Sequence, residues 1–388
     1  MIFDKPSAKR FEDVRIEGSE EPVKDAAEIG KTVFQLIEGT ESVRVVKHSG
    51  SKASVSVPDA ITVAKRQYAV KEIGAGSFSG CVSIASVSLP DSIEDIGESA
   101  FSGCTGITDV LLPRSIRSIR GRAFSGCTSL TRITMPDSPD TIGRSAFDGC
   151  TSLKAFRVEK GKGRFCSDSQ GVLYDGDMTS LLRVPYAMEG TVDVPPGVER
   201  LTDGSFSECS GVTSVRIPRS VKAIGDRVFT GCRKLALVYV DPGNTKYRSD
   251  LQGIVYDWDV TEVIRAPNSI AGALEIPNTV RTIRSSAFEG CTGLVSVSIP
   301  YSTVEIEDSA FEGCSRIRTV NMRGGVVRIG ESAFRNCSGI ITLSIPDSVE
   351  AIGDRAFYGC SRLNTVHLPF GARVGEQAFP ANSDIVLE

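Results

Sequence analysis

Hydrophobic and polar positions along the chain repeat with a period of 23 residues. In one typical unit, residues 123–145, the segment 130–135 alternates apolar and polar side chains, as a half-buried β-strand does. Pro136 then ends the strand, because proline cannot donate a hydrogen bond to a neighbouring strand. A second apolar step at Ile142 leads to a Phe-x-Gly-Cys corner, where glycine permits backbone conformations that other residues rarely adopt. Each unit therefore predicts a short strand, a second apolar step and a tight corner.

The phenylalanine of this corner marks the repeats. Seven of the ten gaps between successive anchor phenylalanines are 23 residues long, the last is 22, and two are 59. One unit alone cannot bury its apolar face, whereas stacked units form a continuous sheet with rows of equivalent side chains inside. The sequence therefore predicts a β-rich solenoid of 23-residue coils. Two rows are expected to form its structural ladders: Phe78, Phe101, Phe124, Phe147, Phe206, Phe229, Phe288, Phe311, Phe334 and Phe357, and Cys81, Cys104, Cys127, Cys150, Cys209, Cys232, Cys291, Cys314, Cys337 and Cys360.

The two 59-residue gaps contain related insertions, near residues 157–190 and 239–272. Their sequences, FRVEKGKGRFCSDSQGVLYDGDMTSLLRVP and VYVDPGNTKYRSDLQGIVYDWDVTEVIRAP, align at an offset of 82 residues. Each contains a Gly-(Val/Ile)-(Leu/Val)-Tyr-Asp strand, a turn, and an apolar return strand that ends in proline. This pattern predicts a β-hairpin in each insertion, and a duplicated 82-residue block explains both without a separate domain.

The stretch KEIGAGSFSGCVSI, residues 71–84, has some features of the glycine-rich loop of a protein kinase. Ser79 stands where the third glycine of that loop belongs, and Lys71 precedes the loop instead of following it. The chain also has no D-F-G motif and no histidine in an H-R-D context. The same stretch matches the repeat, with Gly76 at a position that other units fill with small or polar residues. We therefore predict a structural role for it.

Composition narrows the classes of function. The chain has 388 residues, of which 40% are hydrophobic and 24% charged, as in a folded soluble protein. Its net charge of −4 gives no general electrostatic reason to expect nucleic acid or an anionic membrane as partner. The first residues carry an early charge and no apolar run, so no secretory signal is predicted, and no window is apolar enough for a membrane helix. These features predict a cytoplasmic chain as printed.

Eleven cysteines raise the question of disulfides or a metal site. The ten at the repeat position are expected to point into the core as thiols, where a thiol behaves as a small hydrophobe. Disulfides between adjacent coils and a metal site are the alternatives, although no C-x-x-C pair occurs and neither His48 nor His367 completes a zinc site. Cys166 lies outside the ladder and is expected to be more exposed. A thiol ladder suits a reducing compartment without requiring one.

No catalytic residue, metal ligand or cofactor is predicted. The aspartates of the hairpin turns, at Asp175, Asp177, Asp257 and Asp259, lack the further oxygen ligands that a calcium loop needs, and aspartate is an ordinary turn residue. The two histidines lie near opposite ends of the array, and no G-x-S-x-G or H-E-x-x-H motif occurs. An enzyme with an unrecognised carboxylate site remains a remote alternative.

Solvent-facing strand positions provide the candidate binding surface. They are mostly Ser, Thr and Asn toward the C-terminus and become larger and more basic in the middle of the chain. Tyr, Trp and Arg dominate the binding energy of protein interfaces. The alternative is that these side chains only favour β-structure and have no partner. The predicted binding residues are Arg132, Arg157, Arg216, Leu237, Tyr239 and, at the tip of the second hairpin, Trp258.

The repeat resembles the BspA-type, or Treponema-type, leucine-rich repeat. The resemblance rests on lines such as LSIPDSVEAIGDRAFYGCSRL, residues 343–363, and extends over residues 32–388. It implies a leucine-rich repeat right-handed superhelix. It also implies an N-terminal β cap with the first strand of the array over residues 32–77, followed by the repeat solenoid over 78–388. Residues 1–31, which are highly charged and non-periodic, are predicted to be a flexible leader.

Members of the resembling family are commonly cell-surface or secreted proteins of microbes and protists that take part in attachment. The resemblance therefore implies a non-enzymatic protein-binding module with an adhesion or interaction role, whose protein partner and oligomeric state the sequence does not identify. An intracellular scaffold or regulatory adaptor that uses the same face is the alternative. No nucleic-acid partner and no membrane insertion are expected.

Overall fold

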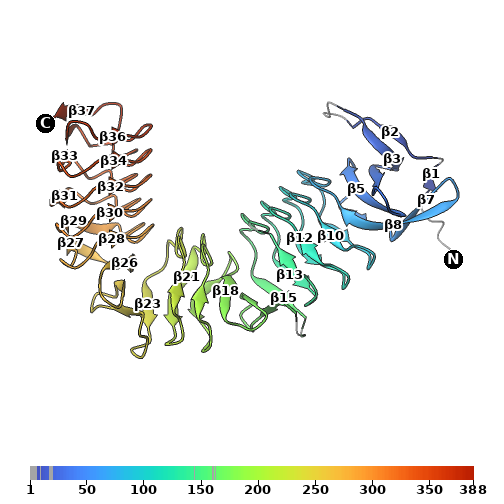
Figure 1. Ribbon diagram of the computed structural model, residues 1–388, viewed down its shortest axis with the longest axis horizontal. Coiled ribbons are helices and arrows are strands. Elements are labelled where there is room, and N and C mark those ends of the chain that lie inside the picture. The colour runs from blue at the N-terminus through green and yellow to red at the C-terminus, as the bar shows by residue number, and fades with distance from the viewer. Residues whose placement is uncertain (1–6, 9, 17–20, 144, 160, 162) are drawn as a thin grey trace. The chain divides into compact units, whose positions relative to one another are not determined.

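The computed structural model describes residues 7–8, 10–16, 21–143, 145–159, 161 and 163–388. Within these ranges the secondary structure consists of β-strands and turns, with no helix (Figure 1). The chain divides into two compact units. Unit 1 comprises Met1–Met178 with Pro185–Ala187, and unit 2 comprises Thr179–Val184 with Met188–Glu388.

Unit 1 begins with a β cap. Strands β2 (Glu12–Val14), β3 (Val23–Ile29), β4 (Thr32–Leu36) and β5 (Ser42–His48) pair in antiparallel order, and β5 then pairs in parallel with β8 (Arg66–Ile73). Strand β7 (Ala60–Val63) pairs with β8 and with β1 (Ser7–Ala8).

Ordered strands thus extend into the region for which the sequence predicts a flexible leader. The charged residues of β3 that suggest a leader face solvent, while Ala26 and Ala27 are buried where β3 pairs with β4. That burial depends on a tertiary partner, which the composition of the segment does not reveal.

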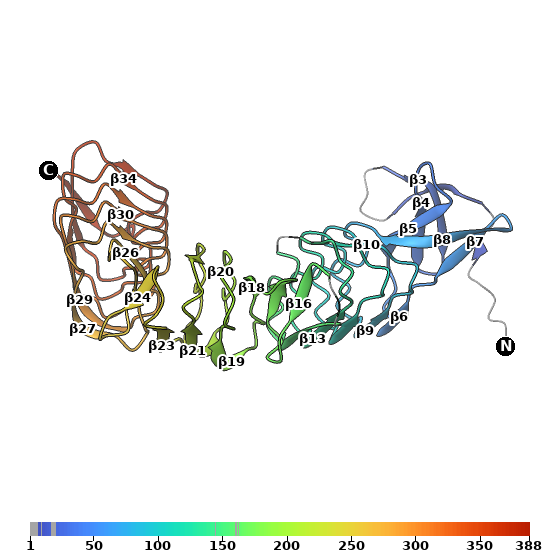
Figure 2. The same ribbon diagram turned by 60° about the horizontal axis from the view of Figure 1, so that its bottom comes forward.

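After the cap, the coils of unit 1 form two parallel ladders, which Figure 2 shows from a second side. The register advances by 23 residues, so that Asp109 lies opposite Arg132 in one ladder and Ile96 opposite Ile119 in the other. Strands β6 and β8 join the cap to these ladders. The first ladder contains β6 (Ser54–Ser56), β9 (Ser86–Ser88), β11 (Asp109–Leu111), β13 (Arg132–Met135) and β15 (Ala155–Val158), and the second contains β8, β10 (Asp95–Ile96), β12 (Ser118–Ile119) and β14 (Thr141–Ile142).

Unit 2 repeats this arrangement with longer ladders. Its first kind of ladder contains β19 (Glu189–Asp193), β21 (Gly211–Ile217) and β23 (Leu237–Val240), then β27 (Ala271–Glu275), β29 (Gly293–Ile299) and β31 (Thr319–Met322), then β33 (Thr342–Ser344), β35 (Thr365–Leu368) and β37 (Asp384–Leu387). Its second kind contains β18 (Ser180–Arg183), β20 (Arg200–Leu201) and β22 (Ala223–Ile224), then β26 (Glu262–Arg265), β28 (Thr282–Ile283), β30 (Glu305–Ile306), β32 (Arg328–Ile329), β34 (Ala351–Ile352) and β36 (Arg373–Val374). The chain is therefore the β-rich solenoid of 23-residue coils that its sequence predicts.

The second insertion forms the predicted hairpin with one further strand. Strands β25 (Val255–Asp257) and β26 pair in antiparallel order, and β24 (Tyr247–Ser249), which the sequence pattern does not indicate, pairs with the other edge of β25. In the first insertion β16 (Phe165–Ser167) pairs with β17 (Leu173–Asp175) in the same way. The return strands β18 and β26 also pair in parallel with β20 and β28, so each belongs to a coil as well as to an insertion.

The core consists of stacked phenylalanines and a row of thiols. The fully buried rings of Phe288, Phe311 and Phe334 stack with centroids 4.9 Å apart. Cys337 donates a hydrogen bond from its Sγ to the Phe311 carbonyl oxygen at 3.1 Å, and most ladder cysteines repeat this bond. All eleven cysteines are thiols, and burial raises the pKa of Cys360 to about 12. The thiols thus pack as small apolar groups that also bind the preceding coil.

His48 continues the phenylalanine stack into the cap. Its ring lies 5.1 Å from that of Phe78, only 8% of the residue is exposed, and Thr32 Oγ1 lies 2.9 Å from its Nδ1. Burial lowers the pKa of His48 below its ordinary value, because the charged imidazolium loses hydration.

We expect the stability of unit 1 to fall as the pH is lowered through 6.5. The unfolded chain binds a proton at His48 more readily than the folded chain, so the stabilisation is complete above the unfolded pKa and is lost below it. Urea unfolding at pH 7.5 and pH 5 measures this loss, and His48→Phe should reduce it by as much as about 1 kcal/mol. An unchanged pH dependence in His48→Phe would assign the loss to other groups.

Candidate interaction surface

In unit 1, the predicted residues Arg132 and Arg157 lie on neighbouring strands of the first ladder. Arg132 is opposite Ala155 on one side and Asp109 on the other, and its Nη2 lies 3.0 Å from the Asp109 Oδ1. Arg157 is exposed beside Thr134, whose other neighbour, Leu111, is 65% exposed. This surface therefore combines two guanidinium groups with one apolar side chain.

In unit 2, three of the predicted residues are direct neighbours on one sheet. Arg216 on β21 lies opposite Tyr239 on β23, and Leu237 lies two residues before Tyr239 on the same side of the strand. Tyr239 and Leu237 are 45% and 46% exposed. Arg216 Nη1 lies 3.1 Å from Asp193 Oδ1, an exposed ion pair that contributes little stability. We call Arg216, Leu237 and Tyr239 the β21–β23 cluster.

Trp258 lies in the turn between β25 and β26, as the sequence predicts for the tip of the hairpin. Its backbone N donates to the Lys246 carbonyl oxygen at 2.8 Å, and its ring lies 5.9 Å from the Arg248 guanidinium carbon. Trp258 remains 46% exposed. The hairpin thus holds the indole at the surface beside a cation.

Two arginines that the sequence analysis does not single out hold the duplicated blocks together. Arg265 is only 1% exposed, and its guanidinium donates to the Ser286 carbonyl oxygen and, at 2.7 Å, to Asn268 Oδ1. At the equivalent position 82 residues earlier, Arg183 donates to the carbonyl oxygens of Gly204 and Ser207. The signal that could have revealed them is an arginine in the same place in both return strands, LLRVP and VIRAP.

The glycine-rich stretch at residues 71–84 cannot offer its corner amides to a phosphate. The backbone N atoms of Gly76, Phe78 and Gly80 donate to the carbonyl oxygens of Glu98, Ala100 and Ser102 in the next coil, at 2.9, 2.8 and 2.7 Å. Gly76 has φ +60°, and Ser99 takes the same left-handed conformation at the equivalent position, with φ 54°. The stretch is therefore a repeat corner, as its spacing predicts.

The candidate calcium ligand Asp257 is a turn anchor. Its carboxylate accepts hydrogen bonds from the backbone N atoms of Thr261 and Glu262 and from Thr261 Oγ1, at 2.6 to 2.7 Å. Among the residues that the structure describes, no group of three or more His, Cys, Asp or Glu side chains is arranged to hold a metal ion. No described helix is long and apolar enough to cross a membrane.

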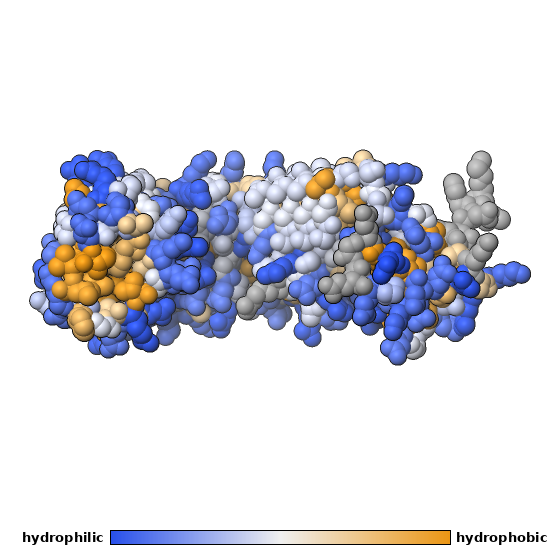
Figure 3. Space-filling view, turned by 90° about the horizontal axis from the view of Figure 1, so that it is seen from above, coloured by the Kyte–Doolittle hydropathy of each residue, from blue (hydrophilic) through white to orange (hydrophobic). Residues whose placement is uncertain are grey.

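Apolar side chains also gather on the C-terminal coil, which lies at the left in Figure 3. Ile385 and Leu387 on β37 are 44% and 58% exposed, although they occupy the register positions of the buried Val366 and Leu368. Strand β37 thus forms as the sequence predicts, but its own apolar positions are uncovered. Phe370, 85% exposed, adds to this face.

The chain matches the model of the BspA type leucine rich repeat region. The match covers residues 62–168, 190–250 and 268–386, more than half of the chain. No curated protein matches the chain.

Two solved structures resemble the fold over most of its length. A leucine rich cell surface protein from Faecalibacterium prausnitzii is 22% identical, with 92% of this chain and 95% of that chain covered and a TM-score of 0.50. The pneumococcal vaccine antigen PcpA is 18% identical, with 93% of this chain and 87% of that chain covered and a TM-score of 0.50. At these identities the likeness concerns the fold.

Proposed function

The chain belongs to the BspA-type leucine-rich repeat family, and from this premise we propose that it is a non-catalytic module that binds a protein partner through its exposed ladder positions. The observation that carries the proposal is the β21–β23 cluster. It presents an arginine, a tyrosine and a leucine side by side on two paired strands. Rigid strands hold such side chains at low entropic cost, and Tyr and Arg are enriched among the residues that dominate binding energy.

The experiment compares the full chain with a variant in which Arg216, Leu237 and Tyr239 are all replaced by Ala. Partners captured on the immobilised chain from host-cell and source-cell extracts are identified, purified and titrated by biolayer interferometry. We expect the triple variant to bind at least tenfold more weakly, because it loses the aromatic and guanidinium contacts. Arg132→Ala and Arg157→Ala test the unit 1 surface in the same assay, and Trp258→Ala tests the hairpin.

A matched control replaces exposed residues on later strands, Thr319, Asn321 and Thr342, by Ala. These positions belong to the same outward rows but are small and polar. The control should bind as the unaltered chain does, and both variants should keep the unfolding temperature of the unaltered chain. Equal affinity of the triple variant and the unaltered chain would remove the β21–β23 cluster from the binding site.

For location, we propose the cell surface or the extracellular space. The support is the description of the Faecalibacterium prausnitzii protein as a cell surface protein. The eleven thiols favour the alternative, an intracellular scaffold, since reducing compartments keep cysteines unpaired. Protease treatment of intact source cells distinguishes the two: digestion of the chain supports the surface location, and complete protection supports the scaffold.

A further inference from the structure

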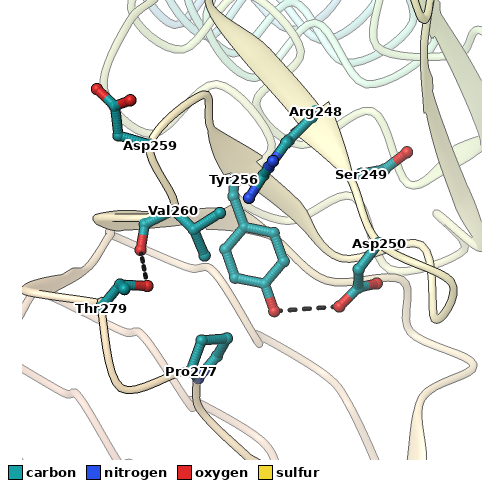
Figure 4. A pocket seen from close by; sticks show the side chains of 8 residues that line it. All are labelled: Arg248, Ser249, Asp250, Tyr256, Asp259, Val260, Pro277 and Thr279. Carbon is teal, nitrogen blue, oxygen red and sulfur yellow. Dashed lines mark hydrogen bonds between the residues drawn. The ribbon is translucent and has the colours of Figure 1, made fainter.

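The second insertion of unit 2 forms a cavity of about 490 Å³ (Figure 4). Arg248 from β24 and Asp250 just after it, Tyr256 from β25, and Asp259 from the turn line one part of it. Thr279, from the loop after β27, lies on the opposite side. This volume is within the roughly 300–1,000 Å³ that is usual for small-molecule sites.

The floor of the cavity is fixed before any ligand arrives. The Tyr256 hydroxyl donates to Asp250 Oδ2 at 3.2 Å, and Asp250 Oδ1 accepts from the backbone N atoms of Gln252 and Ile254, both at 2.9 Å. Tyr256 is only 3% exposed, so that its ring is part of a packed wall. A ligand would therefore meet an aromatic surface that needs no rearrangement.

Two charged groups at the cavity have unused hydrogen-bonding capacity. Within the described part of the chain, the Arg248 guanidinium and the Asp259 carboxylate have no hydrogen-bond or ion-pair partner, and they do not pair with each other. Contact with the Trp258 ring restrains Arg248. The cavity thus offers a donor and an acceptor beside an apolar wall.

The duplicated block separates the scaffold of this cavity from what is particular to it. In the first insertion, Tyr174 donates to Asp168 Oδ2 at 2.8 Å, exactly as Tyr256 does to Asp250 one block later. The positions of Arg248 and Trp258, however, are occupied by Cys166 and Gly176. The aspartate–tyrosine bond is therefore common to both blocks, whereas the arginine beside the tryptophan belongs to the second block alone.

We propose that this cavity binds one neutral pyranose ring of a saccharide. Sugar hydroxyls both donate and accept, so one ring can donate to Asp259 and accept from Arg248 at the same time. Its C–H face can pack on Tyr256 and on the apolar lining residues Val260 and Pro277. A cationic ligand would be repelled by Arg248, and an anionic one by Asp250 and Asp259. This site does not depend on the protein-binding function.

The test uses the full chain and the fluorescence of Trp258, its only tryptophan. The probes are the methyl pyranosides of glucose, galactose, mannose and N-acetylglucosamine, and we expect at least one to give a saturable change in the millimolar range. Arg248→Ala and Asp259→Asn should each weaken it at least fivefold. Because Arg248→Ala also alters the surroundings of Trp258, saturation-transfer NMR of the bound pyranoside provides a second measure of affinity.

The matched control is Asp177→Asn, the position equivalent to Asp259 in the first insertion. It should bind as the unaltered chain does, and unfolding curves should be the same for all variants. Failure of all four pyranosides to bind would overturn the proposal, as would unchanged affinity in Arg248→Ala and Asp259→Asn. Stronger binding of methylguanidinium or inorganic phosphate than of any pyranoside would overturn the assignment to a neutral ligand.

Discussion

Replacing Phe311 by alanine is expected to lower the free energy of unfolding of unit 2 by about 3–5 kcal/mol. The ring is fully buried and lies between Phe288 and Phe334, with both centroids 4.9 Å away. Its removal loses the transfer free energy of an aromatic side chain and both stacking contacts, and leaves a cavity between coils whose spacing the ladders fix. Urea unfolding followed by circular dichroism measures the change in midpoint and slope.

The control for this prediction is Phe370→Ala, since Phe370 is 85% exposed. The same chemical deletion should there cost less than about 0.5 kcal/mol. Phe311→Leu should recover part of the loss, because leucine refills some of the cavity. Similar effects of Phe311→Ala and Phe370→Ala would mean that the phenylalanine ladder does not carry the core.

Replacing Arg265 by alanine is expected to cost about 3 kcal/mol. The guanidinium is buried and donates to Ser286 and Asn268, and hydrogen bonds from a charged group contribute about 1.5–3 kcal/mol each. The substitution also leaves the Ser286 carbonyl oxygen without this donor at the corner of the next coil. The same urea experiment measures the loss.

Two further variants identify the cause of that loss. Arg265→Lys keeps the charge but not the planar fork that reaches both acceptors, so it should recover only a part of the stability. Arg323→Ala, at an exposed arginine, should change stability by less than about 0.5 kcal/mol. Full recovery by lysine would show that the charge, and not the paired hydrogen bonds, stabilises the coil.

The fold could be predicted because the period of the sequence is also the register of the structure. A shift of 23 residues brings Ile96 beside Ile119 and Asp109 beside Arg132, so one unit describes its neighbours. The early strands could not be predicted in the same way. Burial of Ala26 and Ala27 in β3 depends on pairing with β4, and their own segment is rich in charge.

The candidate surface was only partly predictable. The alternation of strand residues places Arg216 and Tyr239 on the outer side, and the register then makes them neighbours. Sequence spacing does not show that Asp193 pairs with Arg216, or that β24 and β25 enclose a cavity with Arg248 at its edge. These features arise from contacts between strands in different coils and from the additional strand of the insertion, which leave no periodic signal.

The parallel ladders also determine how the molecule would respond to tension. Each strand of the second ladder in unit 2 is held mainly by the coil before it and the coil after it, as Ile306 is by Ile283 and Ile329. A force that pulls on β37 therefore acts first on the bonds to β35 and not on the whole array. The last coil would peel away alone and transfer the load to the next, so that the protein would lengthen in steps of about one repeat of chain.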